Sequence, residues 1–234
     1  GEVVGMRAAF GGAILMALVS MLIQQKLIDD DSAKIAPGAD ARLNFKQISQ
    51  LKFSPALKNL LVADILVRFC EQIPYAFVVV WCMKTIASPV SASRFGILTA
   101  VEMGTAMLIY VPVAYLADRG SKKPFVTMTF VFFSLFPVVL LYCQSFEWLL
   151  AAFVIRGLKE FGEPSRKALI MDLAPDHAKA ASFGLYYLIR DSILTLAALC
   201  GAVLWQIDPK LNLLTAAAFG FLATLWFAWK GKAA

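Results

Sequence analysis

The chain has 234 residues, of which 60% are hydrophobic and only 16% are charged, and its mean hydropathy is +0.71. This composition excludes a soluble domain with an ordinary polar surface. The net charge of +6 does not indicate nucleic-acid binding, because the basic residues are scattered through short polar segments and form no dense stripe with interleaved aromatic residues. We therefore expect an all-α membrane protein whose partner is the lipid bilayer, with no nucleic acid.

Seven segments are predicted to span a membrane, because each offers about 20 mostly apolar residues and can pair its backbone groups within a helix. In chain order they cover 8–23, 57–83, 95–117, 125–143, 148–171, 181–205 and 211–229. Turn residues agree with these limits: Ser54-Pro55 predicts a capped helix start, and Asp208-Pro209 predicts a turn. The second and fifth segments contain the most charge.

The longest polar stretch separates the first span from the other six. It contains three aspartates from Asp29 and a Pro37-Gly38 turn, which indicates a linker, with a surface helix expected over 45–51. We predict a first transmembrane helix over 1–25, a cytoplasmic linker over 26–56 and a six-helix transmembrane domain over 57–234. The chain begins Gly-Glu-Val-Val without an initiator methionine, so we expect a fragment or a processed piece.

The distribution of lysine and arginine predicts the orientation, because these residues resist translocation and accumulate on the cytoplasmic side. With seven crossings, the linker, the turn at Lys122, the turn at Lys179 and the C-terminus fall on one side, and most basic residues lie there. We therefore expect the linker and the C-terminus to be cytoplasmic, in a bacterial-type inner (plasma) membrane.

Ionisable residues occur at depth in four of the predicted spans, the second, third, fifth and sixth. Each such residue costs roughly 2.5–3.5 kcal/mol at a helix centre unless it is paired or faces water. In chain order these residues are Asp64, Arg68, Glu71, Glu102, Arg156, Lys159, Glu160, Glu163, Arg190 and Asp191.

The spacing of these residues predicts polar stripes on two helices. At about 100° per residue, Asp64, Arg68 and Glu71 fall on one face, and Tyr75 joins it one turn further on. The fifth span repeats the same i, i+4, i+7 pattern from Arg156 through Glu160 to Glu163. A polar stripe cannot face lipid, so both stripes are expected to face a protein interior or an aqueous cavity.

Four of these residues are the main candidates for the transport pathway. Glu71 and Glu160 are candidate proton or substrate-cation sites, and Arg68 and Arg156 are the partners that tune them or bind anionic groups.

Depth in the membrane also predicts an ion pair between Glu163 and Arg190. The alternative is that Arg190, with Asp191 or Glu163, only holds helices together.

The turn after the third span reads Ala114-Tyr115-Leu116-Ala117-Asp118-Arg119-Gly120-Ser121-Lys122-Lys123-Pro124. It resembles the cytoplasmic loop motif of the major facilitator superfamily, Gly-x-x-x-Asp-Arg-x-Gly-Arg/Lys-Arg/Lys. Asp118, Arg119, Lys122 and Lys123 match this motif, whereas Ala114 and Ser121 stand where the family has glycines. The resemblance implies a gate that ties the turn to a neighbouring helix end through Asp172. The alternative is a solvated turn followed by positive-inside lysines.

A longer stretch, from Arg156-Gly157 through Gly162-Glu163-Pro164 to Phe183-Gly184-Leu185-Tyr186-Tyr187, resembles the tenth and eleventh helices of bacterial-type permeases of that superfamily. With the opening Gly5-Met6-Arg7-Ala8-Ala9-Phe10, the resemblance covers family helices six to twelve. It implies alternating access between two six-helix halves around a midplane site. It also implies that the missing N-terminal half is a partner. In that fold, helices seven, eight, ten and eleven line the cavity or contact the other half, and these are the charged spans.

We therefore predict a secondary active transporter, by symport or antiport, that moves a small-molecule substrate and is coupled to an ion or proton. The sequence contains no Walker loop, metal cluster or nucleophile elbow, so we predict no enzyme, no cofactor and no metal. One alternative is a non-transporting membrane assembly or scaffold module. Another is a seven-helix receptor, although a retinal protein would need a lysine within its last span, and 211–229 has none.

Overall fold

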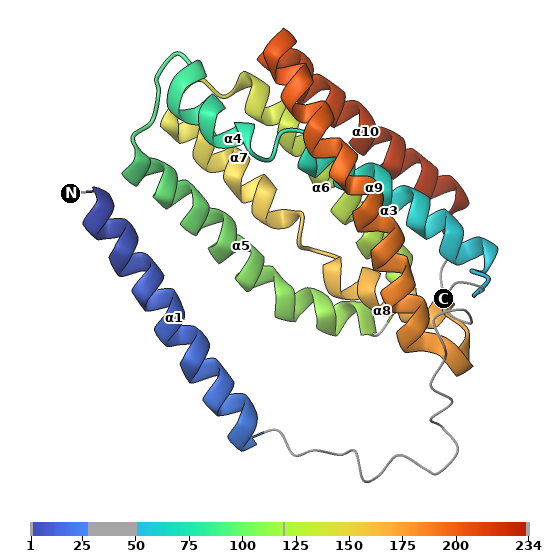
Figure 1. The fold of residues 1–234 in the computed structure, drawn as a ribbon. Helices are drawn as coiled ribbons and strands as arrows, with labels where there is room; N and C mark the ends of the chain where they lie inside the picture. Colours follow the sequence, from blue (N-terminus) through green and yellow to red (C-terminus); the bar gives the residue numbers. More distant parts are fainter. Residues whose placement is uncertain (1, 28–50, 119, 233–234) are drawn as a thin grey trace. The chain divides into compact units, whose positions relative to one another are not determined.

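The computed structural model of the chain describes residues 2–27, 51–118 and 120–232, and every regular element in these ranges is a helix (Figure 1). The chain is thus all-α, as predicted. It divides into two units, Gly1–Leu43 and Asn44–Ala234, which are described separately. The surface helix expected over 45–51 and most of the expected linker lie outside the described residues, so the predicted domain limits remain predictions.

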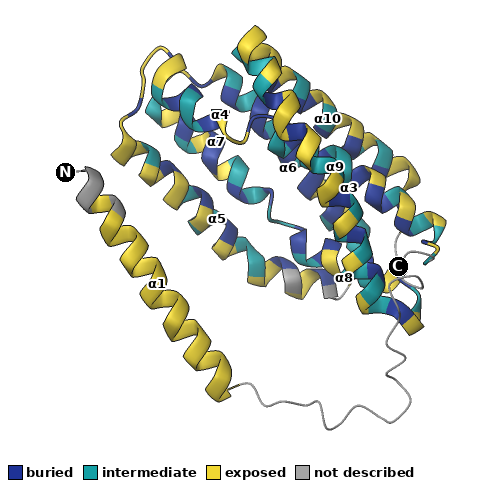
Figure 2. Ribbon diagram, in the orientation of Figure 1, coloured by how far each residue is buried: buried dark blue, intermediate teal, exposed yellow. Residues whose placement is uncertain are grey.

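The described residues of the first unit form one helix, α1 (Glu2–Leu27). It is exposed at every residue whose side chain is described (Figure 2). An apolar helix without a buried face in its own unit requires lipid or another protein surface around it.

The second unit contains ten helical elements among its described residues. In chain order they are α3 (Pro55–Gln72), α4 (Phe77–Val80), the π-helix η2 (Trp81–Thr85), α5 (Ala92–Asp118), α6 (Lys122–Tyr142), α7 (Phe146–Leu158), α8 (Glu163–Leu173), the 3₁₀-helix η3 (Asp176–Ala178), α9 (Lys179–Ile207) and α10 (Pro209–Lys230). Helix α10 packs most extensively against α3 and α6, and α5 packs against α7.

Six helical stretches among the described residues are long and apolar enough to cross a membrane, including α1. The predicted span over 148–171 is not one of them because it is divided into α7 and α8. All seven predicted spans are nevertheless helical. The predicted capped start at Ser54 is confirmed, because its hydroxyl accepts a hydrogen bond from Leu57 N at 3.2 Å. The predicted turn at Asp208 separates α9 from α10, and Asp208 Oδ1 accepts a hydrogen bond from Lys210 N at 2.8 Å.

Contacts between helix ends show that the span beginning with α3 and the span of α6 run in one direction and that the span of α7 and α8 runs in the other. At one end, Ser54 donates to the Leu173 carbonyl at 3.2 Å, which joins the start of α3 to the end of α8. At the opposite end, the Gln144 side chain accepts from Ala87 N at 2.9 Å, which joins the loop after η2 to the turn after α6. These directions are the ones that the predicted orientation requires.

Two spans are interrupted, and both interruptions lie next to a proline. Residues 73–76 form a turn that contains Pro74, and residues 159–162 form a turn just before Pro164, which lies in the first turn of α8. Pro112, by contrast, lies within the unbroken α5. The second interruption corrects one expectation: the stripe predicted along a continuous helix from Arg156 does not exist, because the helix ends at Leu158.

The apolar core has two main parts. One contains Leu57, Phe130, Leu169 and Phe227 and is built by α3, α6, α8, α9 and α10. The other is built mainly by α4, η2, α5, α6 and α7. Ionisable side chains from the same helices are buried beside this core, and they define the site described next.

Candidate functional site

An unbroken series of ion pairs links side chains from α3, α5, α8, α9 and the end of α7. We call it the charge ladder. Acidic and basic residues alternate along it in the order Asp191, Arg190, Asp64, Arg166, Glu163, Arg68, Glu71, Lys159, Glu102 and Arg156. Five carboxylates and five cations are present, so their formal charges cancel.

The most deeply buried part of the ladder centres on Asp64, which is 0% exposed. Its carboxylate accepts hydrogen bonds from Arg166, from the Tyr186 hydroxyl at 3.0 Å and from Arg190 at 3.4 Å. Arg166 is 1% exposed and also binds Glu163 through two parallel hydrogen bonds, of 2.6 and 2.9 Å. Such a fork is the strongest geometry for an arginine and a carboxylate, and it compensates both groups for the loss of water.

Arg68 joins this buried part to the rest of the ladder. Its guanidinium donates to Glu71 at 2.7 Å and to Glu163 at 3.2 Å, and it lies over the Phe133 ring at 5.3 Å from the ring centre. The aromatic face adds favourable electrostatic contact for a cation that is removed from water.

The other end of the ladder depends on the interruption between α7 and α8. Lys159, the first residue after α7, places its ammonium 2.8 Å from Glu71 on α3 and 3.4 Å from Glu102 on α5. Arg156, in the last turn of α7, lies 3.2 Å from the same Glu102 carboxylate. Three helices are thus joined by two carboxylates and two cations.

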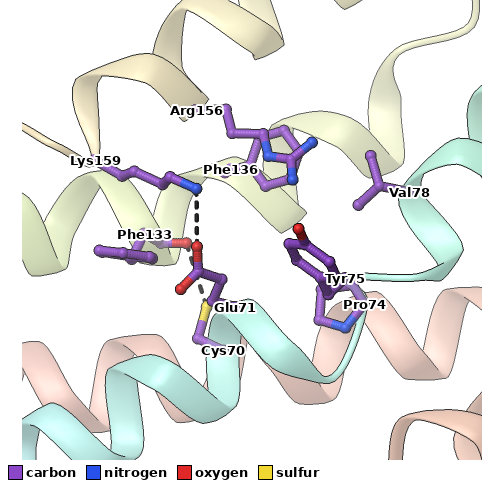
Figure 3. A pocket seen from close by; sticks show the side chains of 9 residues that line it. All are labelled: Cys70, Glu71, Pro74, Tyr75, Val78, Phe133, Phe136, Arg156 and Lys159. Carbon is purple, nitrogen blue, oxygen red and sulfur yellow. Dashed lines mark hydrogen bonds and ion pairs between the residues drawn. The ribbon is translucent and has the colours of Figure 1, made fainter. Parts of the chain in front are cut away.

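Two hollows adjoin this end of the ladder. Figure 3 shows the smaller one, with Lys159 bonded to Glu71 and the Tyr75 ring beside Arg156; its volume of about 20 Å³ is on the scale of a water molecule. The larger one is open, has a volume of about 460 Å³ and is also lined by Glu102. A solute in this larger space, the solute hollow, would meet both signs of charge, an aromatic ring and a phenol hydroxyl.

The candidates on α3 lie together as their spacing predicts: Arg68 pairs with Glu71 and lies 3.9 Å from Asp64. Tyr75 lies in the turn after α3, is 57% exposed and lines both hollows. Glu160 is half-buried in the turn after α7 and has no ion-pair partner among residues 51–118 and 120–232.

The expected ion pair between Glu163 and Arg190 is wrong. Glu163 pairs with Arg166 and Arg68, whereas Arg190 pairs with Asp64 and, at 2.8 Å, with Asp191. In the order of the ladder, Arg166 and Asp64 both lie between the two expected partners.

Two members of the site were not selected from the sequence, Arg166 and Tyr186, and Lys159 was noted only as a charge at depth. A signal for Arg166 was present, since it follows Glu163 by three residues and therefore shares its helix face. Tyr186 had no such signal, because its bond to Asp64 joins residues 122 positions apart.

The loop motif is only partly described. Arg119 and the side chain of Asp118 lie outside the described residues. Lys122 pairs with Asp172 near the end of α8, and the Lys123 backbone carbonyl accepts a hydrogen bond from the Thr127 hydroxyl at 2.9 Å. The turn is thus tied to the helix end expected for a gate, through Lys122, and a gating role remains a prediction.

The family model of the Major Facilitator Superfamily matches residues 60–233, and the chain belongs to this superfamily. It is similar to the quinolone resistance protein NorA of Staphylococcus aureus (strain COL), with 28% identity over 134 residues, which is 57% of this chain and 34% of NorA. It is also similar to the uncharacterized MFS-type transporter MJ1317 of Methanocaldococcus jannaschii, with 22% identity over 116 residues, 49% of this chain and 29% of that relative.

The match therefore spans about a third of the length of these relatives. Together with the apolar spans, it identifies the chain as a membrane-embedded part of a protein of this superfamily.

Proposed function

We propose that this chain provides the C-terminal half of a secondary active transporter that moves a small solute by alternating access, with α1 belonging to the other half. The observation that carries the proposal is the charge ladder, which runs from the buried Asp64 to the solute hollow. Charged side chains buried in apolar spans are costly, and they persist where they serve a pathway or pair tightly.

The end of the ladder that borders the solute hollow supports solute binding in particular. Glu102 there contacts both Arg156 and Lys159, so a charged group of a solute can take the place of one partner while the other partner remains. Binding that exchanges ion pairs in this way can favour one arrangement of the surrounding helices over another, which is what a two-state carrier requires.

Proton coupling is the finer part of the proposal, with Glu160 and Glu71 as its candidates. Glu71 is bonded to Arg68 and to Lys159, which stabilise its anionic form. Glu160 has no such partner in the described chain, so taking up a proton would break no ion pair. We therefore assign proton binding to Glu160. We assign to Glu71 an exchange of ion-pair partners that accompanies solute binding.

The name of NorA gives the first solute to test, a quinolone. A quinolone carries a carboxylate and an amine, and both signs of charge line the solute hollow. We also propose that the end of the bundle with Lys122, Lys179 and Lys230 faces the cytoplasm of a bacterial-type cell.

The test is uptake of a radiolabelled quinolone by liposomes that contain the full-length protein, with and without an imposed pH gradient. We expect accumulation driven by the gradient, its loss in Glu160→Gln, and retention of gradient-independent exchange in the same variant. Glu147→Gln is the matched control, because Glu147 is exposed at the start of α7 and bonds Ser145 outside the ladder.

Unchanged gradient-driven uptake in Glu160→Gln would reject the proton site. If the unsubstituted protein folds and assembles but moves no quinolone or other small solute, the scaffold function is favoured instead.

A further inference from the structure

The turn between α3 and α4 leaves the Ile73 carbonyl without its helical partner. In a continuous helix the Ile73 carbonyl would accept from Phe77 N, but Phe77 N donates to the Pro74 carbonyl instead, at 2.8 Å. Ile73 is buried, with 1% exposure, so water does not replace the missing donor. An unpaired carbonyl in such a place destabilises the fold.

Asn212 on α10 supplies the donor. Its side-chain nitrogen donates to the Ile73 carbonyl at 3.3 Å and to the Gly201 carbonyl of α9 at 2.8 Å. Both neighbours are acceptors, so the amide group must present its N–H groups to them. The side-chain oxygen of Asn212 is buried without a hydrogen-bond partner in the described chain. A residue selected for packing alone would not retain this unpaired oxygen.

Gly201 allows the helices to come this close. A Cβ atom at Gly201 would collide with the backbone carbonyl of Ile73, since its carbon would lie only 3.0 Å away. The end of α3, the middle of α9 and the start of α10 therefore meet at one carbonyl group, and only a glycine on α9 permits that contact.

The opposite side of the same turn faces the solute hollow. Tyr75 and Ala76, in the same turn as Ile73, line the solute hollow together with Glu71. Pro74 and Tyr75 line the smaller hollow, which Figure 3 shows. Tyr75 has few other constraints, since its side chain is more than half exposed. The position of its ring is therefore set by the backbone of the turn, and that backbone is bound by Asn212.

We propose that Asn212 is a positioning residue of the solute hollow. By binding the Ile73 carbonyl, it fixes the turn between α3 and α4 and so the places of Tyr75 and Glu71, although it lines neither hollow itself. The inference deepens the proposed function, because the solute hollow is the site whose geometry Asn212 controls.

The experiment uses the full-length protein with Cys200→Ser, which removes the exposed native thiol, and Ala76→Cys, which adds a reporter thiol in the turn. The rate of modification of that thiol by a charged methanethiosulfonate reports the position of the turn without any need for transport. We expect Asn212→Leu to change this rate about tenfold, the factor for one lost buried hydrogen bond. We also expect the KM for quinolone uptake, measured without the reporter, to rise about tenfold with little change in kcat.

The matched control is Asn59→Leu. The Asn59 amide also donates to a backbone carbonyl, that of Lys230 at 3.4 Å, but at the far end of α3. We expect neither the modification rate nor the KM to change in this variant. Equal effects of the two substitutions would overturn the inference, because they would reflect general loosening.

Two further variants keep the test decisive if Asn212→Leu does not fold. Gly201→Ala retains Asn212 but pushes the Ile73 carbonyl away, so it should change the modification rate in the same way. Asn212→Asp keeps the shape of the side chain, but the new carboxyl group can donate a hydrogen bond only when it is protonated. The change in the modification rate should therefore become smaller at low pH. Wild-type modification rates in both variants would overturn the inference. Absence of transport in the unsubstituted protein would count against the proposed function alone, since the thiol assay does not depend on it.

Discussion

The interrupted spans and the uninterrupted helices of the second unit have different roles. The spans formed by α3 with α4 and by α7 with α8 contribute most of the charge ladder, and each contains a turn at depth. Helices α6 and α10 run unbroken for 21 and 22 residues, and their lysines lie only near their ends. The two spans with irregular backbone thus also contribute most of the buried charge, where protein replaces lipid as the surrounding medium.

Helices α6 and α10 also each stabilise one interruption with a polar side chain. Thr129 on α6 accepts a hydrogen bond from Gly162 N in the turn before α8, and Asn212 on α10 donates to Ile73 in the turn after α3. Helices α6 and α10, which have no charged residue at depth, therefore do more than pack against the other helices. They provide hydrogen-bond partners for backbone groups that the interrupted spans leave unpaired.

The largest change in the free energy of unfolding is expected for a substitution within the charge ladder. Arg166→Met removes the shared partner of Asp64 and Glu163 and leaves two buried carboxylates undercompensated. We expect the free energy of unfolding in detergent to fall by about 3–5 kcal/mol. Lys167→Met is the control: Lys167 is half-exposed, lies 3.7 Å from Glu163 and should matter by less than about 1 kcal/mol. Similar losses in both variants would show that the ladder is not a stabilising unit.

A second substitution tests the close contact between an interrupted span and α6. A Cβ atom at Gly162 would collide with the backbone of Phe125, so Gly162→Ala should destabilise the protein by about 1–3 kcal/mol. Gly184→Ala, within α9, meets no atom within 4 Å and should be neutral or slightly stabilising, because alanine favours helix. A lower midpoint of thermal unfolding for Gly184→Ala than for Gly162→Ala would contradict the close contact between the interrupted span and α6.

A third substitution isolates the hydrogen bond at the same turn. Thr129→Val keeps the shape of the side chain and removes the acceptor for Gly162 N, for an expected loss of about 1–2 kcal/mol. Thr127→Val, on the same helix, removes only a bond to the helix's own Lys123 carbonyl. Its effect should be under about 0.5 kcal/mol in the same denaturant titration. Indistinguishable midpoints would show that α6 does not stabilise the interruption.

The smallest effect on stability is expected at the loop motif. Lys122 and Asp172 are both partly exposed, so Lys122→Gln should lower the free energy of unfolding by less than about 1 kcal/mol, as should Lys123→Gln. If the turn acts as a gate, Lys122→Gln alone will change the rate of quinolone uptake. Equal uptake rates in the two variants would favour a solvated turn.

The sequence predicted which spans are charged more successfully than which side chains meet. Hydropathy and the i, i+4, i+7 spacing placed Asp64, Arg68 and Glu71 on one face, since both signals are local. The ladder partners were harder because they join distant helices: Asp64 pairs with a residue 102 positions away. The position of Lys159 depends on the turn after Leu158, which a helical period assigned to the whole span could not reveal.

The alternation of signs along the ladder has an electrical consequence. Each elementary charge that moves fully through a membrane potential of 100 mV changes the energy by about 2.3 kcal/mol. Five negative and five positive side chains that tilt together displace almost no net charge. We therefore expect the empty half to reorient with little voltage dependence, so that the electrogenicity of a cycle is set by the cargo and by any proton carried with it.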